Sequence, residues 1–506
     1  MVAHRPRPDC RRFEARPTLQ TTAQRDRRRP TGRHDPHAGR SHQPAARVAE
    51  EPQRNAQQAS GRSGVSMKNI VVIGAGIAGL AAACKLVEAG CSVTVLEASD
   101  RVGGRIRTVQ ANGVPVELGA EFVHGKPPEL LGLIDDLGIE TYELGGEMIH
   151  FSPDGSLHAE TDEDVSSDDS PFPVMEQMAA WSEAHPGEDE SFAEWLALTG
   201  NSAEGAASAT GYVEGFNAAD ATAISVRSLA VQQHAEDEID GDMSFHVSGG
   251  YQGLPDALVR RFEAAGGSLR RNSPVNEIVW QQGSVRVVLA SGEVVHGDAA
   301  LVTLPLGVLQ AGTVQFTPPP GDVLQQAQHM RMGQVCRISL VFKRRWWADL
   351  PHVASETLQK LGFLIAAERV SGAHFNVFWS GFPSLDPVLT AWSGGPSSEA
   401  FDGLDDHAIA HIVCGDLARI FELTQEQVLG EMASHHRHNW ASDPLALGAY
   451  SWVAVGGADA SAEMTKPAEN TLFFAGEHTD TSGHWGTVHG ALRSGLRAAQ
   501  QVMEAP

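Results

Sequence analysis

The sequence predicts an α/β fold, and three observations carry that prediction. An apolar run suited to a buried parallel strand at residues 70–73 leads into a glycine-rich turn, a helix-like segment and a second apolar run. Strand-like and helix-like segments then alternate toward the C-terminus. The 506 residues, 42% of them hydrophobic, are enough for two or three globular units.

The first strand and turn carry the residues of a Rossmann-type dinucleotide site. Residues 70–73 form the predicted strand, and Gly74, Gly76 and Gly79 supply the spacing G-x-G-x-x-G at the turn. Gly74 permits the tight turn, Gly76 lets a pyrophosphate approach the backbone, and Gly79 allows close packing of the helix. The amino end of that helix then faces the phosphates.

The second strand ends in an acidic residue, and a second glycine turn follows it. Glu97 directly follows the apolar run 93–96, where a carboxylate accepts hydrogen bonds from ribose hydroxyls. In the next segment, DRVGGRIRT, we expect Arg101, Gly104 and Arg105 to contact the cofactor. A glycine pair followed by arginine offers a close backbone approach and a fixed cation for a pyrophosphate. The alternative for this segment is an exposed polar turn.

Charge is distributed unevenly along the chain. Residues 1–66 hold 14 Arg, no Lys and six acidic residues, a net of +8, whereas the rest of the chain has a net charge of −33. An acidic body repels nucleic acid and anionic membranes and attracts a cationic substrate, although solvation explains an acidic surface equally well. Five scattered cysteines and the lack of a long apolar window fit a cytoplasmic protein without zinc or other metal, disulfide framework or membrane span.

Residues 1–66 are predicted to be disordered. The segment is dominated by Arg, Pro, Gln, His and Ala, a composition that cannot bury enough apolar surface to offset the entropy of ordering. We favour the interpretation that translation begins at Met67, directly before the first strand, so that this segment is not translated. An organelle transit peptide and a basic arm for nucleic acid are the alternatives.

Six motifs in order cover nearly all of residues 67–506. They are VVIGAGIAGLAAA, LEASDRVGGRIRT, VELGAEFVHG, PVNEIVW, LVTLPLGVL and LFFAGEHTDTSGHWGTVHGALRSG. With them the chain resembles the flavin-containing amine oxidase family, which includes monoamine oxidases, polyamine oxidases and histone lysine demethylases. The resemblance implies a discontinuous Rossmann-type FAD-binding domain with an interleaved α+β substrate-binding domain. The expected FAD-binding parts are 67–125, 246–310 and 441–506, with a mainly helical substrate part at 126–245 and a β-rich one at 311–440. Within the helical part, we expect the acidic segment 154–171 to form an exposed loop.

The resemblance also implies further contacts to FAD. They are Gly119, Ala120 and Glu121 beside the flavin ring, Val275 at the adenine, Gly476 and Glu477 at the ribityl chain, and Thr487 and Val488 at the start of the last helix. The dipole of that helix would stabilise the negative charge of reduced flavin, unless the helix is only an ordinary amphipathic one. Some family members attach flavin through a cysteine before the last motif. Since no cysteine follows Cys414, we expect FAD to be bound noncovalently.

Arg337 departs from the pattern of the family. In the segment MRMGQVCRISLVF it stands where similar enzymes commonly carry a lysine that water links to flavin N5. Arginine keeps the positive charge but cannot be deprotonated, and its planar fork would position water differently. This departure from the family pattern affects how efficiently O2 would reoxidise the flavin. The alternative is that Arg337 is a structural ion-pair residue.

The resemblance places an amine substrate between aromatic walls in front of the flavin. The candidates are Tyr450 and Trp452, with Thr487 where monoamine oxidases carry a tyrosine, which leaves the second wall thinner. His124 matches a histidine that lines the tunnel of many polyamine oxidases. Core packing is the alternative for the two aromatic residues, and a structural role for the histidine. Phe122 stands where an amino-acid oxidase should have an arginine, which disfavours that activity.

The implied function is FAD-dependent oxidation of a primary or secondary amine, polyamines included. Hydride leaves the carbon next to the amine, the resulting imine hydrolyses to an aldehyde or ketone, and O2 is reduced to H2O2. One alternative is a desaturase or porphyrinogen-type oxidase acting on a neutral hydrophobic substrate, and another is a flavin-binding protein without turnover. The sequence specifies neither the amine nor the number of subunits.

Overall fold

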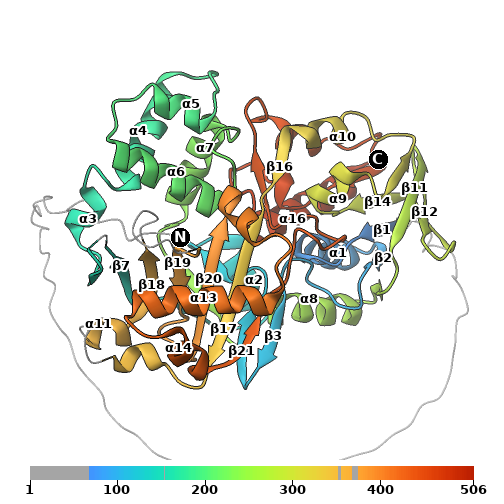
Figure 1. Cartoon of the computed structure of the whole chain (residues 1–506). Coiled ribbons are helices and arrows are strands. Elements are labelled where there is room, and N and C mark those ends of the chain that lie inside the picture. Colours follow the sequence, from blue (N-terminus) through green and yellow to red (C-terminus); the bar gives the residue numbers. More distant parts are fainter. Residues whose placement is uncertain (1–67, 153, 351–354, 367–373) are drawn as a thin grey trace, which may run out of the picture. The chain divides into compact units, whose positions relative to one another are not determined.

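The chain folds as a mixed α/β protein, which confirms the predicted fold class (Figure 1). The computed structural model describes residues 68–506 except 153, 351–354 and 367–373. The predictions for residues 1–66 lie outside the described residues. The segment 68–506 belongs to one compact unit.

A five-stranded parallel sheet organises the residues that matter most for the site. In spatial order its strands are β10 (Ser268–Arg270), β2 (Ser92–Leu96), β1 (Asn69–Ile73), β14 (Ala299–Val302) and β23 (Leu472–Phe474). β1, β14 and β23 are almost fully buried apolar runs, as expected of parallel strands covered on both faces. Because all five strands are parallel, their carboxyl ends meet at one edge of the sheet.

Three helices pack together beside this sheet. α1 (Ile77–Glu88) contacts both α16 (Val488–Glu504) and α8 (Gly253–Ala264), and their apolar faces share one core with the strands. The approach of α16 to α1 is close at Gly495, where a Cβ atom would lie 2.2 Å from the carbonyl oxygen of Ala78. Packing at this distance requires glycine.

Four further sheets have two to four strands each. A four-stranded sheet has the order β13 (Val294–Gly297), β12 (Ser284–Leu289), β11 (Val275–Gln281) and β15 (Gln315–Thr317). The others are β5 (Phe122–His124), β9 (Ser244–Val247) and β6 (Thr141–Glu143); β3 (Thr108–Ala111) with β4 (Val114–Glu117); and β16 (Met330–Met332) with β22 (Ser451–Val453). β5 and β22 carry residues that the sequence singles out.

A seven-stranded mixed sheet forms a second layer. Its order is β21 (Met432–His436), β17 (Val335–Phe342), β20 (Val388–Gly394), β19 (Val377–Trp379), β18 (Leu361–Ala366), β7 (Glu147–Phe151) and β8 (Leu157–Ala159). α13 (Asp406–Ile420) packs on β17 and β21, and α14 (Gln425–Glu431) packs on α13 (Figure 1). The apolar side chains between these helices and the strands form a separate core.

One local expectation is wrong. The acidic segment 154–171 was expected to be an exposed loop, but it contains β8 and the short helix α3 (Asp162–Ser166). The helix begins because the side chain of Thr161 accepts from the backbone N–H of Asp164 while the Asp164 carboxylate accepts from the N–H of Thr161. β8 forms because it pairs with β7, a tertiary contact that acidity does not reveal.

Four of the remaining helices pack together. α4 (Pro171–Ala184), α5 (Phe192–Ala197), α6 (Ala203–Asn217) and α7 (Val226–Glu238) share a core of their own. The shorter helices are α2 (Pro128–Asp136), α9 (Leu306–Ala311), α10 (Val323–Gln326), α11 (Ser355–Gln359) and α15 (Ala460–Met464). Within the described part of the chain, no helix has the length and apolar character needed to cross a membrane. The cytoplasmic location stays a prediction.

The close contact between α1 and α16 predicts opposite effects for two glycine replacements. Gly495→Ala should destabilise the protein by about 1–3 kcal/mol, because the added methyl group collides with the backbone of α1. Gly132→Ala, within α2, should be neutral or stabilising by up to about 1 kcal/mol, because no atom of the described residues lies within 4 Å of its Cβ position. Urea unfolding of both variants measures the difference. Equal stability of the two variants would contradict the packing described above.

Candidate active site

A cavity of about 740 Å³ opens where the carboxyl ends of the parallel strands meet. Residues just after the ends of four of these strands line it, namely Gly74 after β1, Glu97 after β2, Thr303 after β14 and Gly476 two residues after β23. Ligands of open parallel sheets bind at this edge, because loops from neighbouring strands converge there. All the residues that the sequence singles out line the cavity, with the exception of Gly79.

The first glycine turn is held by close backbone contacts. Gly74 has a φ of +104°, which favours glycine, and the Thr303 hydroxyl donates to the carbonyl of Ile73 at 2.7 Å. A Cβ atom on Gly79 would lie 2.1 Å from the carbonyl oxygen of Gly74. Gly76 differs, since no atom of the described residues lies within 4 Å of its Cβ position, although it lines the cavity. A side chain at 76 would therefore fill space that the protein leaves open.

Glu97 and Arg101 stabilise the two loops beside the cavity. One carboxylate oxygen of Glu97 accepts from the N–H of Ala75 at 2.8 Å, and the other accepts from the N–H and hydroxyl of Ser99 at 2.9 Å. The Arg101 guanidinium donates to the carbonyl of Gly104 at 2.7 Å, within its own loop. Both side chains thus hold loop backbone in place while they line the cavity.

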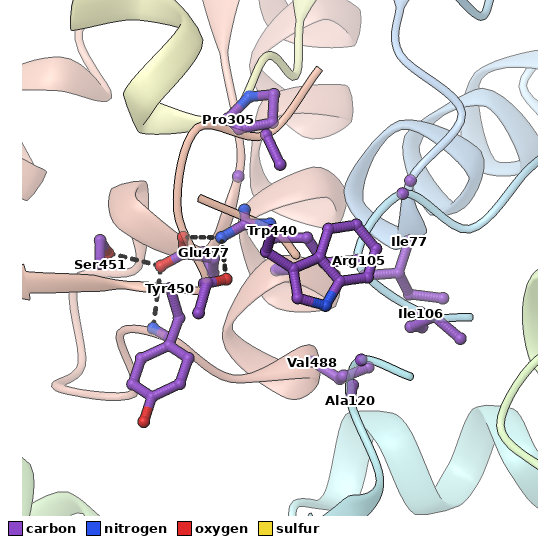
Figure 2. A pocket seen from close by; sticks show the side chains of 18 of the residues that line it. Ile77, Arg105, Ile106, Ala120, Pro305, Trp440, Tyr450, Ser451, Glu477 and Val488 are labelled. Atoms are coloured by element: carbon purple, nitrogen blue, oxygen red, sulfur yellow. Dashed lines mark hydrogen bonds and ion pairs between the residues drawn. The ribbon is translucent and has the colours of Figure 1, made fainter. Parts of the chain in front are cut away.

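Half-buried Arg105 and buried Glu477 form an ion pair on one side of the cavity (Figure 2). The guanidinium donates to one Glu477 oxygen at 2.7 Å and to the carbonyl of Ala449 at 3.1 Å. The second Glu477 oxygen accepts from the Ser451 hydroxyl at 2.5 Å and from the N–H of Gly486 at 2.9 Å. Burial alone would raise the pKa of Glu477, but the charge of Arg105 and the hydrogen bonds outweigh it and lower the pKa.

The amino end of α16 also lines the cavity. Thr487 is the N-cap residue, and its hydroxyl accepts from the N–H of Gly490 at 3.0 Å and donates to the carbonyl of His484 at 2.8 Å. The hydroxyl is therefore used by the helix cap. Val488, the first helical residue, lines the cavity beside it.

A cluster of contacting rings lines another part of the cavity. This aromatic cluster consists of Phe122, His124, Phe216, Phe363, Trp379, Trp392 and Tyr450. Tyr450 stacks on Trp392 with ring centroids 6.4 Å apart and planes 13° apart, and its hydroxyl donates to the carbonyl of Phe216 at 2.7 Å. Trp452 also lines the cavity, but it packs with the core of the helical layer. Tyr450 and Trp392 thus form a parallel pair of rings.

His124 is buried within this cluster. Its ring centroid lies 5.7 Å from that of Phe122 and 6.1 Å from that of Phe216, and its Nδ1 atom has no hydrogen-bond partner among the described residues. Burial lowers the pKa of His124 to about 3, so the ring is neutral at physiological pH. A neutral imidazole with an unpartnered nitrogen can hydrogen-bond a ligand.

Arg337 is held in an ion pair with Glu121. Its guanidinium donates to a Glu121 carboxylate oxygen at 2.5 Å and also to the carbonyl of Gly119. The indole N–H of Trp379 donates to the same Glu121 oxygen at 3.0 Å. The arginine side chain therefore has a structural partner at the cavity wall, the alternative that the sequence left open.

Several cavity residues escape sequence reasoning. Thr303 directly follows the apolar strand β14, with the sequence AALV, and that position is a usable signal. Trp379 and Trp392 lie on the neighbouring strands β19 and β20, and the contact of their rings has no local signal. Ser451 meets Glu477 only because β22 lies beside the cavity.

The residues present fit a bound dinucleotide. A Cβ atom on Gly104 would have the Cα of Gly76 as its neighbour at 3.5 Å, so the two glycine loops face one another without side chains between them. The amino end of α1 begins at this point, with Gly76 as its N-cap. Backbone N–H groups and a helix amino end suit an anionic pyrophosphate.

Comparisons with known proteins agree with this geometry. The model of the family described as flavin containing amine oxidoreductase matches residues 77–503. Polyamine oxidase 4 of Oryza sativa subsp. japonica is 29% identical over 478 residues, 87% of this chain and 89% of that protein. Polyamine oxidase 2 of Arabidopsis thaliana is 28% identical over 457 residues, 85% of this chain and 87% of that protein.

Solved structures show the same fold. A putrescine oxidase bound to putrescine superposes with a TM-score of 0.72 at 23% identity, covering 86% of this chain and 99% of that one. Cyclohexylamine oxidase from Brevibacterium oxydans IH-35A has a TM-score of 0.72 at 21% identity, covering 87% and 99%. The family match extends over most of the chain and confirms the resemblance seen in the sequence. This chain therefore belongs to the flavin-containing amine oxidoreductase family, an FAD-dependent group of oxidoreductases that act on amines.

Proposed function

We propose that this protein oxidises a primary or secondary amine, polyamines included, to an imine, with O2 as the electron acceptor and H2O2 as a product. The observation that carries the proposal is the aromatic cluster with a neutral, unpartnered histidine in the same cavity as the glycine loops. FAD, when bound, supplies the two-electron acceptor. The polyamine oxidases among the relatives favour an amine over a neutral hydrophobic substrate.

The cofactor is proposed to lie against the carboxyl edge of the parallel sheet. The residues proposed to hold it are Gly74, Gly76, Gly79, Arg101, Gly104 and Arg105 around the pyrophosphate, Glu97 at a ribose, Val275 at the adenine, Gly476 and Glu477 at the ribityl chain, and Gly119, Ala120, Glu121, Thr487 and Val488 at the flavin. All but Gly79 line the cavity, which supports this assignment, and Gly79 supports the turn from behind. Arg105 already pairs with Glu477, so its charge acts together with that carboxylate.

The division into a Rossmann-type FAD-binding domain and a substrate domain is also a proposal. All five parallel strands come from residues 67–125, 246–310 and 441–506, the three expected FAD-binding parts. The strands of the seven-stranded sheet come from the expected substrate parts, as do helices α4 to α7. These two observations support the boundaries.

The amine is proposed to bind in the aromatic cluster. The parallel rings of Tyr450 and Trp392 form one wall, while His124 offers a hydrogen bond from a neutral ring. Thr487 and Trp452 line the same cavity and limit its size. Apolar walls exclude water and orient the amine, and little acid–base machinery is required for the reaction.

Incubation with a panel of monoamines, diamines and polyamines tests the proposed function. At least one amine should release H2O2 and, without oxygen, should bleach the flavin absorption near ~450 nm, a wavelength set by the cofactor. Bleaching without H2O2 would show that the amine is oxidised while O2 is a poor acceptor. A flavin-loaded protein that stays inert to every amine would contradict the proposal.

Acid precipitation tests the noncovalent binding of FAD. Because no cysteine follows Cys414, and the described part of that segment offers no thiol to the cavity, all the flavin should remain in the supernatant as intact FAD. Absorbance of pellet and supernatant measures the partition. Flavin that stays with the pellet would show a covalent bond that the structure does not provide.

Glu477→Gln tests the ion pair proposed to support the cofactor. At pH 7 the variant should lose about 1–3 kcal/mol of stability, because half-buried Arg105 is left without its charged partner. The pKa of Glu477 lies below its ordinary value of 4.5, so the carboxylate stabilises the fold above pH 4.5 and loses this effect as the pH falls through the lowered pKa. The stability gap between wild type and variant should therefore narrow in acid.

A matched control uses an ion pair at the surface. Glu293→Gln removes the partner of Arg270, also an arginine–glutamate pair but solvent-exposed, and it should have little effect on stability. Thermal unfolding from pH 3 to pH 8 compares the two variants. A Glu477 variant as stable as the Glu293 variant at pH 7 would refute the buried pair.

A further inference from the structure

A positive charge next to the aromatic cluster is unfavourable for binding a cationic amine. Arg337 lines the cavity and lies over the ring of Trp379, 5.6 Å from its centroid, and Trp379 is a member of the cluster. An amine arrives largely as an ammonium ion at neutral pH. An uncompensated guanidinium at this place would repel the ammonium and would attract a carboxylate.

Glu121 compensates this charge at close range. Its carboxylate lies 2.5 Å from the guanidinium, and both side chains are only 10% exposed, so solvent screens the pair little. The arginine also donates to the carbonyl of Gly119, and Trp379 donates to Glu121, so the pair is fixed in one orientation. The wall at this point is therefore close to neutral.

The other described groups around Glu121 do not neutralise its carboxylate, so the negative charge of Glu121 acts on Arg337. The Nε2 atom of His246 lies 3.3 Å from the second Glu121 oxygen, and burial lowers the pKa of this histidine. Its Nδ1 atom is 3.1 Å from the hydroxyl of Tyr142. A neutral His246 carries no charge to compete for Glu121, so Arg337 is the cationic partner of the carboxylate.

A second cavity of about 250 Å³ lies on the far side of this wall. Glu121, Trp379 and His246 line it together with Glu117. Burial raises the pKa of Glu117 to about 7, and the negative charge of Glu121 adds to this effect. Glu117 binds the N–H of Tyr251 and the hydroxyl of Thr108, and it forms no ion pair with Arg337. Glu117 is therefore a nearby carboxyl group that binds backbone and hydroxyl groups and does not pair with the arginine.

We propose that Glu121 is a specificity-determining positioning residue, whose carboxylate fixes and neutralises Arg337 so that the cavity accepts cationic amines and rejects carboxylates. The inference rests on the proposed function. It also explains how an arginine can line this cavity without making it a site for amino acids. The role acts through Arg337 and requires no direct contact between Glu121 and the substrate.

Glu121→Gln tests the proposal, with benzoate as an anionic probe. The KM for the best amine should rise roughly ten- to hundredfold with a smaller change in kcat, as expected when one unit charge is uncovered near the site. The Kd of benzoate should fall by at least roughly tenfold. Quenching of tryptophan fluorescence reports benzoate binding because Trp379 and Trp392 line the cavity, and this readout requires no turnover.

Two further variants serve as controls. The double variant Glu121→Gln with Arg337→Gln removes both charges and should return the Kd of benzoate close to that of wild type. Glu117→Gln removes the nearby carboxyl group that does not pair with Arg337 and should change neither the KM for the amine nor the Kd of benzoate.

The outcomes are distinct. Unchanged benzoate binding in Glu121→Gln, or an equal effect of Glu117→Gln, would overturn the proposal. If Glu121→Gln does not fold, Arg337→Gln serves as the test. This variant should bind benzoate more weakly than wild type and the amine at least as tightly. An Arg337→Gln variant that binds benzoate as wild type does would overturn the proposal. If no amine is oxidised by any form, the proposed function fails, whereas the benzoate titrations still decide the role of Glu121.

Discussion

The structure of the site depends on one constraint, the convergence of parallel strands at a single sheet edge. β1, β2, β14 and β23 come from three distant parts of the chain, and each ends where the cavity begins. Parallel pairing places their carboxyl ends together, and the loops that follow them therefore meet. The glycines and Thr303 then keep these loops close enough to leave open space only on the cavity side.

Two ion pairs at the cavity share one arrangement. Of the four arginines that line the cavity among the described residues, two are each paired with a glutamate, Arg105 with Glu477 and Arg337 with Glu121. Removing one partner from such a pair leaves an uncompensated buried charge, so each pair constrains the position of its arginine strongly. With neutral His124 between aromatic rings, the region proposed for the amine is apolar and nearly uncharged. A flavin enzyme needs such a region mainly for orientation and the exclusion of water.

Local sequence predicts much of this fold and part of the site. The glycine spacing, the apolar runs at 70–73 and 335–342 and the final helix are readable because strand and helix patterns and turn residues are local properties. The seven-stranded sheet and the ring contact of Trp379 with Trp392 cannot be predicted locally, since separate strands of that sheet create them. The strand β8, in a segment where a loop is expected, is not readable for the same reason, because it exists through its pairing with β7. The partner of Arg337 required the structure, because residues 121 and 337 are far apart in the chain.

Gly76 offers a direct test of whether FAD binds at this sheet edge. Its backbone, with φ −74° and ψ 178°, suits any residue, and its Cβ position meets no atom of the described residues within 4 Å. Equilibrium dialysis of flavin-free protein against FAD, on wild type and Gly76→Val, measures the consequence. We expect Gly76→Val to fold with unchanged thermal stability and to take up no FAD, whereas wild type binds it. A valine variant that binds FAD as wild type does, or a wild type that binds none, would contradict this expectation.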